Sequence, residues 1–323
     1  MKRVAITGVS GYIGTRILKV LDQDKDVETV IGIDVRPPDY STSKLKFYSR
    51  DVRKPMIDIF MRNKVDSAFH LAFVVPPETV VDAHDINIGG SQSFLHACDA
   101  ASVEALFYQS SHTVYGAYPD NPLLITEDQP LRPVPEFPYA ADKAEVDLMF
   151  QEYVKTHPKQ SVTIVRVVAV TGPRAGRSGL NVLFMPVTMY VRGYDPEWQF
   201  IFEDDLAKLD VSLVKGRKSG IFNVGADGAV TYREMLSFTG KPSLGLPSWL
   251  WSALVGIGWK LHLQRKSPVG GLEFMKHPIL LNSEKLIKTV GFKFTMNSRD
   301  ALLSYMKAHN MGKVSQGFVK TRC

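Results

Sequence analysis

The stretch from Lys2 to Arg36 reads KRVAITGVSGYIGTRILKVLDQDKDVETVIGIDVR. It opens with an apolar run over residues 3–7 and breaks at once into a glycine-rich segment. Helically spaced apolar residues follow, and a second apolar run ends at Asp34. Strand, turn, helix and strand in this order are typical of a right-handed βαβ crossover. The stretch therefore predicts the first unit of a parallel sheet.

The glycines of this stretch have the spacing of a dinucleotide site. Gly8 lets the chain turn, Gly11 lets the backbone approach the phosphates, and Gly14 lets the helix pack closely. The helix N-terminus then faces the pyrophosphate. Asp34 lies 20 residues after Gly14, where an acid meets the adenosine ribose hydroxyls and repels a 2′-phosphate. We expect NAD(H) rather than NADP(H), although Arg36 is a neighbouring cation that could accept the phosphate.

Composition narrows the class of protein. The chain has 323 residues, of which 45% are apolar and 22% charged, as in ordinary globular proteins. The net charge of +6 is scattered apart from a small cluster at 260–266, so a nucleic-acid partner is not expected. Two cysteines, Cys98 and Cys323, exclude a disulfide framework and a cysteine zinc site. We expect a cytoplasmic protein without a signal peptide or a bound metal.

Strand and helix patterns alternate as far as residue 172. Strands are predicted at 45–48, 65–75, 105–109 and 162–170, and helices at 57–61, 83–101 and 139–157. A proline-rich segment at 119–138 cannot be regular. The alternation predicts a Rossmann-type, doubly wound parallel sheet of the α/β class.

Beyond residue 172 the elements become short. Strands are predicted at 199–202 and 220–225, an apolar stretch lies at 183–191, and helices begin at Asp204 and Tyr232 and cover 298–309. Thr231 and Glu234 form a capping box. We expect a Rossmann domain over 1–172 to which 197–226 returns, a smaller C-terminal substrate-binding part from 173–196 and 227–309, and a disordered tail over 310–323.

Three side chains at the carboxyl end of the predicted sheet suit hydride-transfer chemistry. Ser111 ends the fifth strand, and Tyr139 and Lys143 are four residues apart on one helix face. An ammonium and a positive nicotinamide would lower the pKa of the phenol, so that Tyr139 acts as acid and base. The serine hydroxyl can hold the oxygen of an alcohol or ketone. The cofactor supplies the hydride chemistry.

These motifs together resemble the extended short-chain dehydrogenase/reductases, the NAD-dependent epimerase/dehydratase family. The matching positions run in register over most of the chain: Thr7, Gly8, Gly11, Gly14, Asp34, Asp51, Val52, His70, Leu71, Ala72, Asn87, Ser110, Ser111, Val114, Tyr115, Gly116, Tyr139, Lys143, Arg166, Gly172, Pro173 and 204–207.

The resemblance implies roles for these residues. Tyr12 and Ile13 cover the pyrophosphate, 51–52 flank the adenine, and 71–73 line the middle of the cofactor. Lys143 also binds the nicotinamide ribose. The implied NAD-binding set is Gly8, Gly11, Tyr12, Ile13, Gly14, Asp34, Arg36, Asp51, Val52, Leu71, Ala72, Phe73, Asn87, Ser110, Tyr139, Lys143 and Val168.

The chain departs from similar enzymes at four positions near the substrate. Nucleotide-sugar epimerases carry an asparagine where this chain has Ala169, and an arginine for the diphosphate where it has Trp198. Sugar-nucleotide dehydratases place an Asp-Glu pair at the positions of His112 and Thr113. Each lost charge-assisted bond is worth roughly 1.5–3 kcal/mol. His112 is either an acid or base near the substrate or a histidine bonded to the proline-rich loop.

Three functions fit these observations. The first is an NAD-dependent dehydrogenase or ketone reductase that acts on a secondary alcohol or ketone with apolar character. The second is an NAD-dependent epimerase of a sugar or nucleotide sugar, which oxidises and re-reduces one carbon. The third is an NAD-binding protein without catalysis. Ala169, Trp198 and the apolar stretch 244–263 favour the first over the second, and the set of Ser111, Tyr139 and Lys143 disfavours the third.

Two surfaces are predicted to meet partners. The helices near 88–102 and 139–157 carry apolar residues on more than one face, including 94–95 and 148–150, which predicts a homodimer. The apolar stretch 244–263 is too short and broken for a membrane span. It is interpreted as an amphipathic helix that helps to line the substrate pocket, with membrane-surface contact as the alternative.

Overall fold

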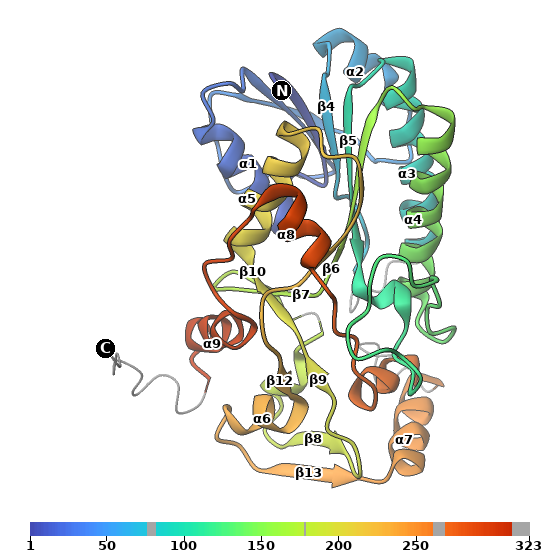
Figure 1. Cartoon of the computed structure of the whole chain (residues 1–323), viewed down its shortest axis with the longest axis vertical. Coiled ribbons are helices and arrows are strands. Elements are labelled where there is room, and N and C mark those ends of the chain that lie inside the picture. Colours follow the sequence, from blue (N-terminus) through green and yellow to red (C-terminus); the bar gives the residue numbers. More distant parts are fainter. Residues whose placement is uncertain (76–81, 178, 261–268, 312–323) are drawn as a thin grey trace.

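The computed structural model describes residues 1–75, 82–177, 179–260 and 269–311. Its centre is a parallel sheet of seven strands in the order β11-β6-β5-β4-β1-β2-β3 (Figure 1). The strands are β1 (Arg3–Thr7), β2 (Thr29–Asp34), β3 (Leu45–Ser49), β4 (Ser67–His70), β5 (Ala105–Ser111), β6 (Ser161–Val167) and β11 (Gly220–Val224). The strand order reverses direction between β1 and β4. Ligands of such sheets bind at the carboxyl ends of the strands beside this switch point.

Helices cover both faces of the sheet (Figure 1). One face carries α1 (Tyr12–Gln23), α5 (Glu203–Lys215) and α8 (Glu284–Val290), and the other carries α2 (Ile57–Asn63), α3 (Ala83–Ala100) and α4 (Pro138–Thr156). Each face of the sheet has its own hydrophobic core, and alternate residues of a strand pack in different cores. In β1, Val4 and Ile6 pack in one core and Ala5 packs in the other. The central strands are largely apolar because both of their faces are buried, whereas the edge strand β3 is partly exposed. The predicted doubly wound parallel sheet is confirmed.

Two predicted strands end earlier than expected. The strand predicted at 65–75 covers only Ser67–His70, after which the chain turns towards α3. The strand predicted at 162–170 divides into β6 and a separate strand β7 (Ala169–Thr171). β7 pairs outside the main sheet with β10 (Phe200–Phe202). The apolar pattern continues beyond both ends because residues 71–74 and 168–171 remain half-buried or buried after they leave the ladder.

Short elements form a smaller part at one end of the sheet (Figure 1). They include η1 (His112–Tyr115), η2 (Asn181–Phe184), β8 (Thr188–Val191), β9 (Glu197–Trp198), β12 (Val230–Thr231), α6 (Tyr232–Ser237), β13 (Ser243–Leu246), α7 (Ser248–Lys260), η3 (Val269–Met275) and α9 (Ser298–Ala308). β8 pairs with β13, and β9 with β12. Half of the predicted capping box is confirmed, since the Thr231 hydroxyl accepts from the Glu234 N–H at 3.2 Å, whereas the Glu234 carboxylate pairs with Arg299 at 3.2 Å. The domain boundaries remain a prediction.

The apolar stretch 244–263 is described as far as residue 260, where it forms the end of β13 and then α7. Residues 261–263, and residues 312–323 of the predicted tail, lie outside the described part of the chain. Within the described ranges, no helix is long and apolar enough to cross a membrane.

Candidate active site

The glycine-rich loop after β1 has the geometry of an anion-binding turn. Gly8 adopts a φ of +74°, and a Cβ there would lie 2.6 Å from the backbone nitrogen of Ala72. A Cβ on Gly14 would collide with the Gly8 carbonyl oxygen, so both positions require glycine. Gly11 is the N-cap residue of α1 and has no side chain to cap the helix, and the first turn of α1 has no acidic residue. The first N–H groups of α1 can therefore bind a phosphate, and the loop fits NAD.

Tyr12 and Ile13 are the first two residues of α1. The Tyr12 hydroxyl donates to Glu203, a buried residue that begins α5. Glu203 also pairs with Arg16 and accepts from the Arg174 N–H at 3.2 Å. Burial and this carboxylate raise the pKa of the Tyr12 hydroxyl. The Tyr12 side chain is directed at α5. Tyr12 and Ile13 can therefore bind a phosphate through their backbone N–H groups.

Asp34 ends β2 beside the glycine-rich loop. Its carboxylate accepts from the Ser10 N–H at 3.1 Å and from the Val35 N–H at 2.8 Å. Arg36 is exposed, and its N–H lies 3.4 Å from the same carboxylate. The position predicted to hold the adenosine ribose therefore carries a carboxylate whose orientation is fixed by the backbone around it.

Asp51 and Val52, predicted to flank the adenine, follow β3. Asp51 pairs with Arg53 at 2.6 Å, and the guanidinium holds the pKa of the Asp51 carboxyl below its usual value. Arg53 also binds Asp85 of α3 at 2.9 Å. Val52 is buried against Gly90 of α3. These contacts attach the predicted adenine segment to α3.

Asn87 of α3 holds the segment 71–73 that is predicted to line the cofactor. Its Oδ1 accepts from the Val74 N–H at 2.8 Å, and its Nδ2 donates to Asp142 of α4 at 2.8 Å. Asp142 also bonds with His84 Nδ1 at 2.7 Å and raises the pKa of His84. Asp142 and His84 are not among the site residues predicted from the sequence. Their one local signal is that His84 and Asn87 are three residues apart on a predicted helix.

The predicted catalytic side chains lie together at the carboxyl end of β5. Ser111 ends β5, and Tyr139 and Lys143 are in the first turns of α4. Ser111 lies close enough to the Tyr139 hydroxyl to oppose the rise in its pKa that burial causes. Ser111 Oγ accepts from the N–H of Thr113 at 3.2 Å and from its hydroxyl at 3.0 Å. Because Ser111 Oγ accepts in both bonds, its own proton is available for donation to Tyr139 or to a substrate oxygen.

Phe73 positions both members of the Tyr139–Lys143 pair. Lys143 is buried, its Nζ donates to the Gln109 carbonyl at 2.6 Å, and it lies 3.7 Å from the centroid of the Phe73 ring. The Phe73 ring meets Tyr139 edge-on, with centroids 5.8 Å apart and planes at 89°. Phe73 was predicted only as a cofactor residue, because its contacts with α4 have no signal in the sequence.

Burial shifts the two pKa values of this pair in opposite directions. It raises the pKa of the Tyr139 hydroxyl to about 12, with Ser111 opposing the rise. It lowers the pKa of the Lys143 ammonium to about 7, with Asp147 opposing the fall. The prediction that the ammonium lowers the pKa of Tyr139 is therefore wrong for the protein by itself, because desolvation of the phenol dominates. The positive charge of an oxidised nicotinamide is the remaining influence that favours the phenolate.

Ser110 is directed away from the predicted site. Its hydroxyl donates to the buried Asp147 at 2.7 Å, and Asp147 forms an ion pair with the buried Arg166 at 2.9 Å. Arg166 also donates to the Tyr115 hydroxyl at 2.8 Å. Successive strand residues face opposite sides of the sheet, so Ser111 points towards the site and Ser110 towards α4. The Ser110 side chain therefore stabilises the junction of β5, β6 and α4, and its predicted role as a cofactor ligand stays a prediction.

His112 anchors η1 to the sheet. Its Nδ1 donates to the Val167 carbonyl at 3.0 Å, and burial lowers its pKa to about 4. The ring is therefore neutral near pH 7, with Nε2 as an acceptor. The bond to β6 replaces the predicted bond to the proline-rich loop. A neutral ring also disfavours the predicted alternative in which His112 donates a proton to the substrate.

Contacts with η3 connect the predicted substrate residues to the start of α4. Val168 is buried, and Ala169 and Trp198 pack half-buried on the core of the smaller part. The Trp198 indole N–H donates to the Phe274 carbonyl of η3 at 3.1 Å. The Phe274 ring contacts Phe137, which precedes α4, with centroids 5.2 Å apart. The predicted substrate side and the start of the catalytic helix are thus in one packed unit.

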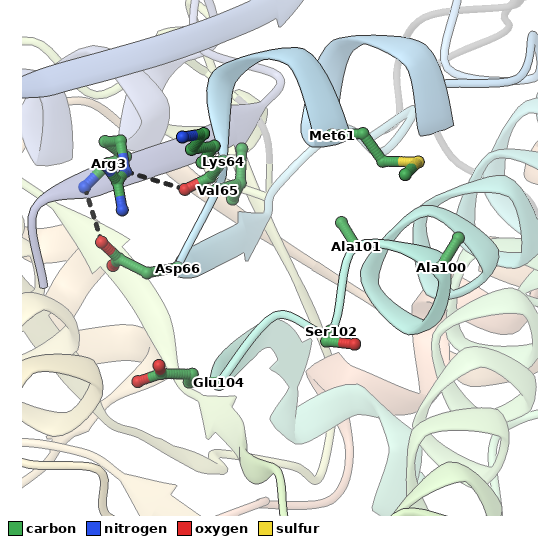
Figure 2. A pocket seen from close by; sticks show the side chains of 9 residues that line it. All are labelled: Arg3, Met61, Lys64, Val65, Asp66, Ala100, Ala101, Ser102 and Glu104. Atoms are coloured by element: carbon green, nitrogen blue, oxygen red, sulfur yellow. Dashed lines mark hydrogen bonds between the residues drawn. The ribbon is translucent and has the colours of Figure 1, made fainter.

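A shallow depression of about 330 Å³ lies at the opposite end of the strands, beside the amino ends of β1, β4 and β5 (Figure 2). Its charged side chains are Arg3, Lys64, Asp66 and Glu104. Arg3 Nε donates to the Lys64 carbonyl at 2.8 Å, Asp66 accepts from the Arg3 N–H at 2.9 Å, and Glu104 pairs with Arg217. Because the hydrogen-bonding groups bind one another and the depression is at the amino ends of the strands, it is not the candidate site.

The sequence and the fold both have known relatives. Residues 4–225 match the NAD dependent epimerase/dehydratase family. An uncharacterised protein of Mycobacterium tuberculosis is 24% identical over 323 residues, which span 96% of this chain and 85% of that protein. UDP-glucose 4-epimerase of Azospirillum brasilense is 32% identical over 185 residues, or 55% of this chain and 52% of that enzyme. This chain therefore matches about half of that epimerase.

Solved structures show the same fold. UDP-glucose 4-epimerase of Thermus thermophilus, in complex with NAD, aligns with a TM-score of 0.74 and 21% identity over 95% of this chain and 99% of that one. MoeE5 in complex with UDP-glucuronic acid and NAD aligns with a TM-score of 0.74 and 20% identity over 95% of this chain and 99% of that one. At sequence identities this low, the similarity to these two structures is a similarity of fold alone.

Proposed function

The chain belongs to the NAD-dependent epimerase/dehydratase family, and from that membership we propose that it is an NAD-dependent epimerase acting on a secondary alcohol carbon of a sugar-like substrate. The observation that supports hydride-transfer chemistry most directly is the packing of Ser111, Tyr139 and Lys143 at the carboxyl end of β5. The UDP-glucose 4-epimerase relatives favour an epimerase over the net dehydrogenase that Ala169 and Trp198 suggested.

The residues of the chain have separable roles in such a cycle. NAD, when bound, takes up a hydride from the carbinol carbon and gives it back. Tyr139 removes the hydroxyl proton as the alcohol becomes a ketone and returns it when the ketone is reduced. Ser111 donates a hydrogen bond to the substrate oxygen in both directions. Inversion requires the ketone to present its other face before the hydride returns, whereas a dehydrogenase releases the ketone.

A net dehydrogenase or reductase remains the second candidate, and the environment of Trp198 favours it. Trp198 stands where similar nucleotide-sugar epimerases carry an arginine, and its indole N–H is bonded to the Phe274 carbonyl. Ala169 offers no amide to a diphosphate. An unpaired diphosphate would be costly to bury, so these two positions suit a neutral or weakly polar alcohol or ketone as substrate.

One assay separates the two candidates. The NAD-loaded protein is incubated with UDP-sugars and with sugars that lack a nucleotide, and both epimer formation by NMR and NADH absorbance are followed. The proposal predicts an epimer without net NADH, and this product should be absent with Tyr139→Phe. Ketone and NADH in equal amounts would instead establish the dehydrogenase.

A competition experiment addresses the substrate class. We expect UDP to bind the NAD-loaded protein weakly, because the chain has Ala169 and Trp198 at the two diphosphate positions. Micromolar binding of UDP or a UDP-sugar would show that this interpretation of the two positions is wrong, and that the substrate is a nucleotide sugar.

Location and assembly are also proposals. We propose a cytoplasmic protein, which rests on the absence of a disulfide framework in the sequence and on the burial of Cys98. We propose a homodimer through α3 and α4, although the support is narrower than the sequence predicted. Phe94, Leu95 and Phe150 are buried within the single chain, whereas Leu148 is 54% exposed.

A further inference from the structure

Helix α7 is apolar but poorly covered by the rest of the chain. It reads SWLWSALVGIGWK and has no acidic residue. No residue from 248 to 258 is buried, and Trp249, Leu254 and Ile257 are 72%, 52% and 56% exposed. Soluble monomers rarely expose contiguous apolar side chains on this scale, and such surfaces mark interaction sites. The interpretation of 244–263 as a helix buried around the substrate pocket is therefore incomplete.

The two-stranded sheet to which α7 is attached also exposes an apolar side chain. The Trp251 indole N–H donates to the Tyr190 carbonyl at 3.3 Å, which joins α7 to β8. β8 pairs with β13, and Leu244 of β13, opposite Met189, is 47% exposed. Figure 1 places β8, β13 and α7 together at the far end of the smaller part, away from the seven-stranded sheet. We call the exposed side chains Leu244, Trp249, Leu254 and Ile257 the α7 face.

The sequence around the α7 face has a one-sided charge. From residue 235 to residue 272 there is no aspartate or glutamate, whereas there are four basic residues, Lys241, Lys260, Arg265 and Lys266. Three of the four tryptophans of the chain are in α7. Tryptophan favours the boundary between water and lipid, and basic segments are attracted to anionic headgroups.

We infer that the α7 face binds the surface of a lipid bilayer that contains anionic lipids. A helix of 13 residues is about 20 Å long, which is shorter than the roughly 30 Å of hydrocarbon in a bilayer, so it lies in the interface. A second copy of the chain is a poorer partner, since the sequence of α7 and its flanks offers no acidic residue to pair with the basic residues of another copy. This inference is independent of the reaction proposed above.

Vesicle sedimentation tests the inference on the full chain with NAD present. The protein is mixed with vesicles of phosphatidylcholine alone and of phosphatidylcholine with phosphatidylglycerol. We expect binding to the anionic vesicles that weakens as salt is raised. Trp249→Glu with Leu254→Glu should weaken binding about tenfold or more, because carboxylates oppose insertion and are repelled by the headgroups. Leu123→Glu is the matched control, since Leu123 is 75% exposed elsewhere, and it should bind as the wild type does.

Thermal unfolding with and without NAD establishes that each variant is folded. The inference is overturned if the wild type does not bind anionic vesicles, or if the double variant binds them as tightly as the wild type. It is also overturned if light scattering without lipid shows a dimer that the double variant loses, because the α7 face then joins two copies.

Discussion

Lys143→Met should stabilise the cofactor-free protein while abolishing its activity. Lys143 is 4% exposed, and burial lowers the pKa of its ammonium from 10.5 to about 7. The native state therefore binds this proton less tightly than the unfolded chain does, and the wild type is less stable at every pH at which the unfolded lysine is charged. Methionine has a similar shape and no charge to desolvate.

The size of the effect follows from the pKa values. A fall from 10.5 to about 7 corresponds to about 5 kcal/mol of unfolding free energy, at about 1.4 kcal/mol per unit. The wild type suffers all of this loss below about pH 7 and regains stability as the pH rises towards 10.5. Methionine gives up the bond to Gln109 and the contact with Phe73, about 1–2 kcal/mol in sum. We expect a net gain of about 3 kcal/mol near pH 6 and almost none near pH 9.

Urea unfolding of the cofactor-free proteins, followed by tryptophan fluorescence near pH 6 and pH 9, measures this difference. Lys46→Met, which changes an exposed lysine of β3, is the control and should have little effect at either pH. Turnover should vanish in Lys143→Met, and NAD should bind more weakly. The reasoning is refuted if Lys143→Met is less stable than the wild type near pH 6, or if the difference is the same at both pH values.

Four further predictions concern other parts of the chain. Tyr139→Phe should lose nearly all turnover and keep almost all NAD affinity, because only the proton-transferring oxygen is removed; substantial turnover in kinetic assays would contradict this. Binding titrations should show tighter binding of NAD(H) than of NADP(H), and Asp34→Asn should narrow the difference; a wild type that prefers NADP(H) would reverse the assignment. Asp210 of α5 is fully buried, neither carboxylate oxygen has a hydrogen-bond partner among the described residues, and burial raises its pKa. Asp210→Leu should therefore raise the unfolding free energy near pH 7 by about 1–3 kcal/mol, and the gain should shrink as the pH falls towards 4 and the carboxyl of the unfolded chain becomes protonated; a gain independent of pH would count against this explanation. Light scattering at micromolar concentration should show a dimer that Leu148→Glu dissociates, and a monomeric wild type would exclude the interface at α3 and α4.

The cofactor half of the site was predictable because its signals are local. Gly14 is required by contacts within the turn between β1 and α1, and Gly8 by its own φ of +74°. Thr231 caps the helix that its own sequence begins. Tyr139 and Lys143 share a helix face because of their spacing alone. None of these features needs a distant part of the chain.

The surroundings of the same residues were not predictable. Asp142 and His84 are 58 positions apart in the sequence, and Tyr12 and Glu203 are 191 apart. Nothing local distinguishes Phe73, whose ring contacts both Tyr139 and Lys143. The apolar run at 162–170 also does not reveal its break after β6, because side chains on both sides of the break are buried.

The sequence by itself determined the parallel sheet, the dinucleotide turn and the one-turn spacing of Tyr139 and Lys143, since each depends on the periodicity of a few neighbouring residues. The tertiary structure decided which apolar side chains stay exposed, so that Phe94 and Phe150 are buried whereas Trp249 is 72% exposed. It also decided the directions of the Tyr139 and Lys143 pKa shifts. Exposure and pKa depend on how completely water is excluded around a side chain, and that is set by elements far apart in the sequence.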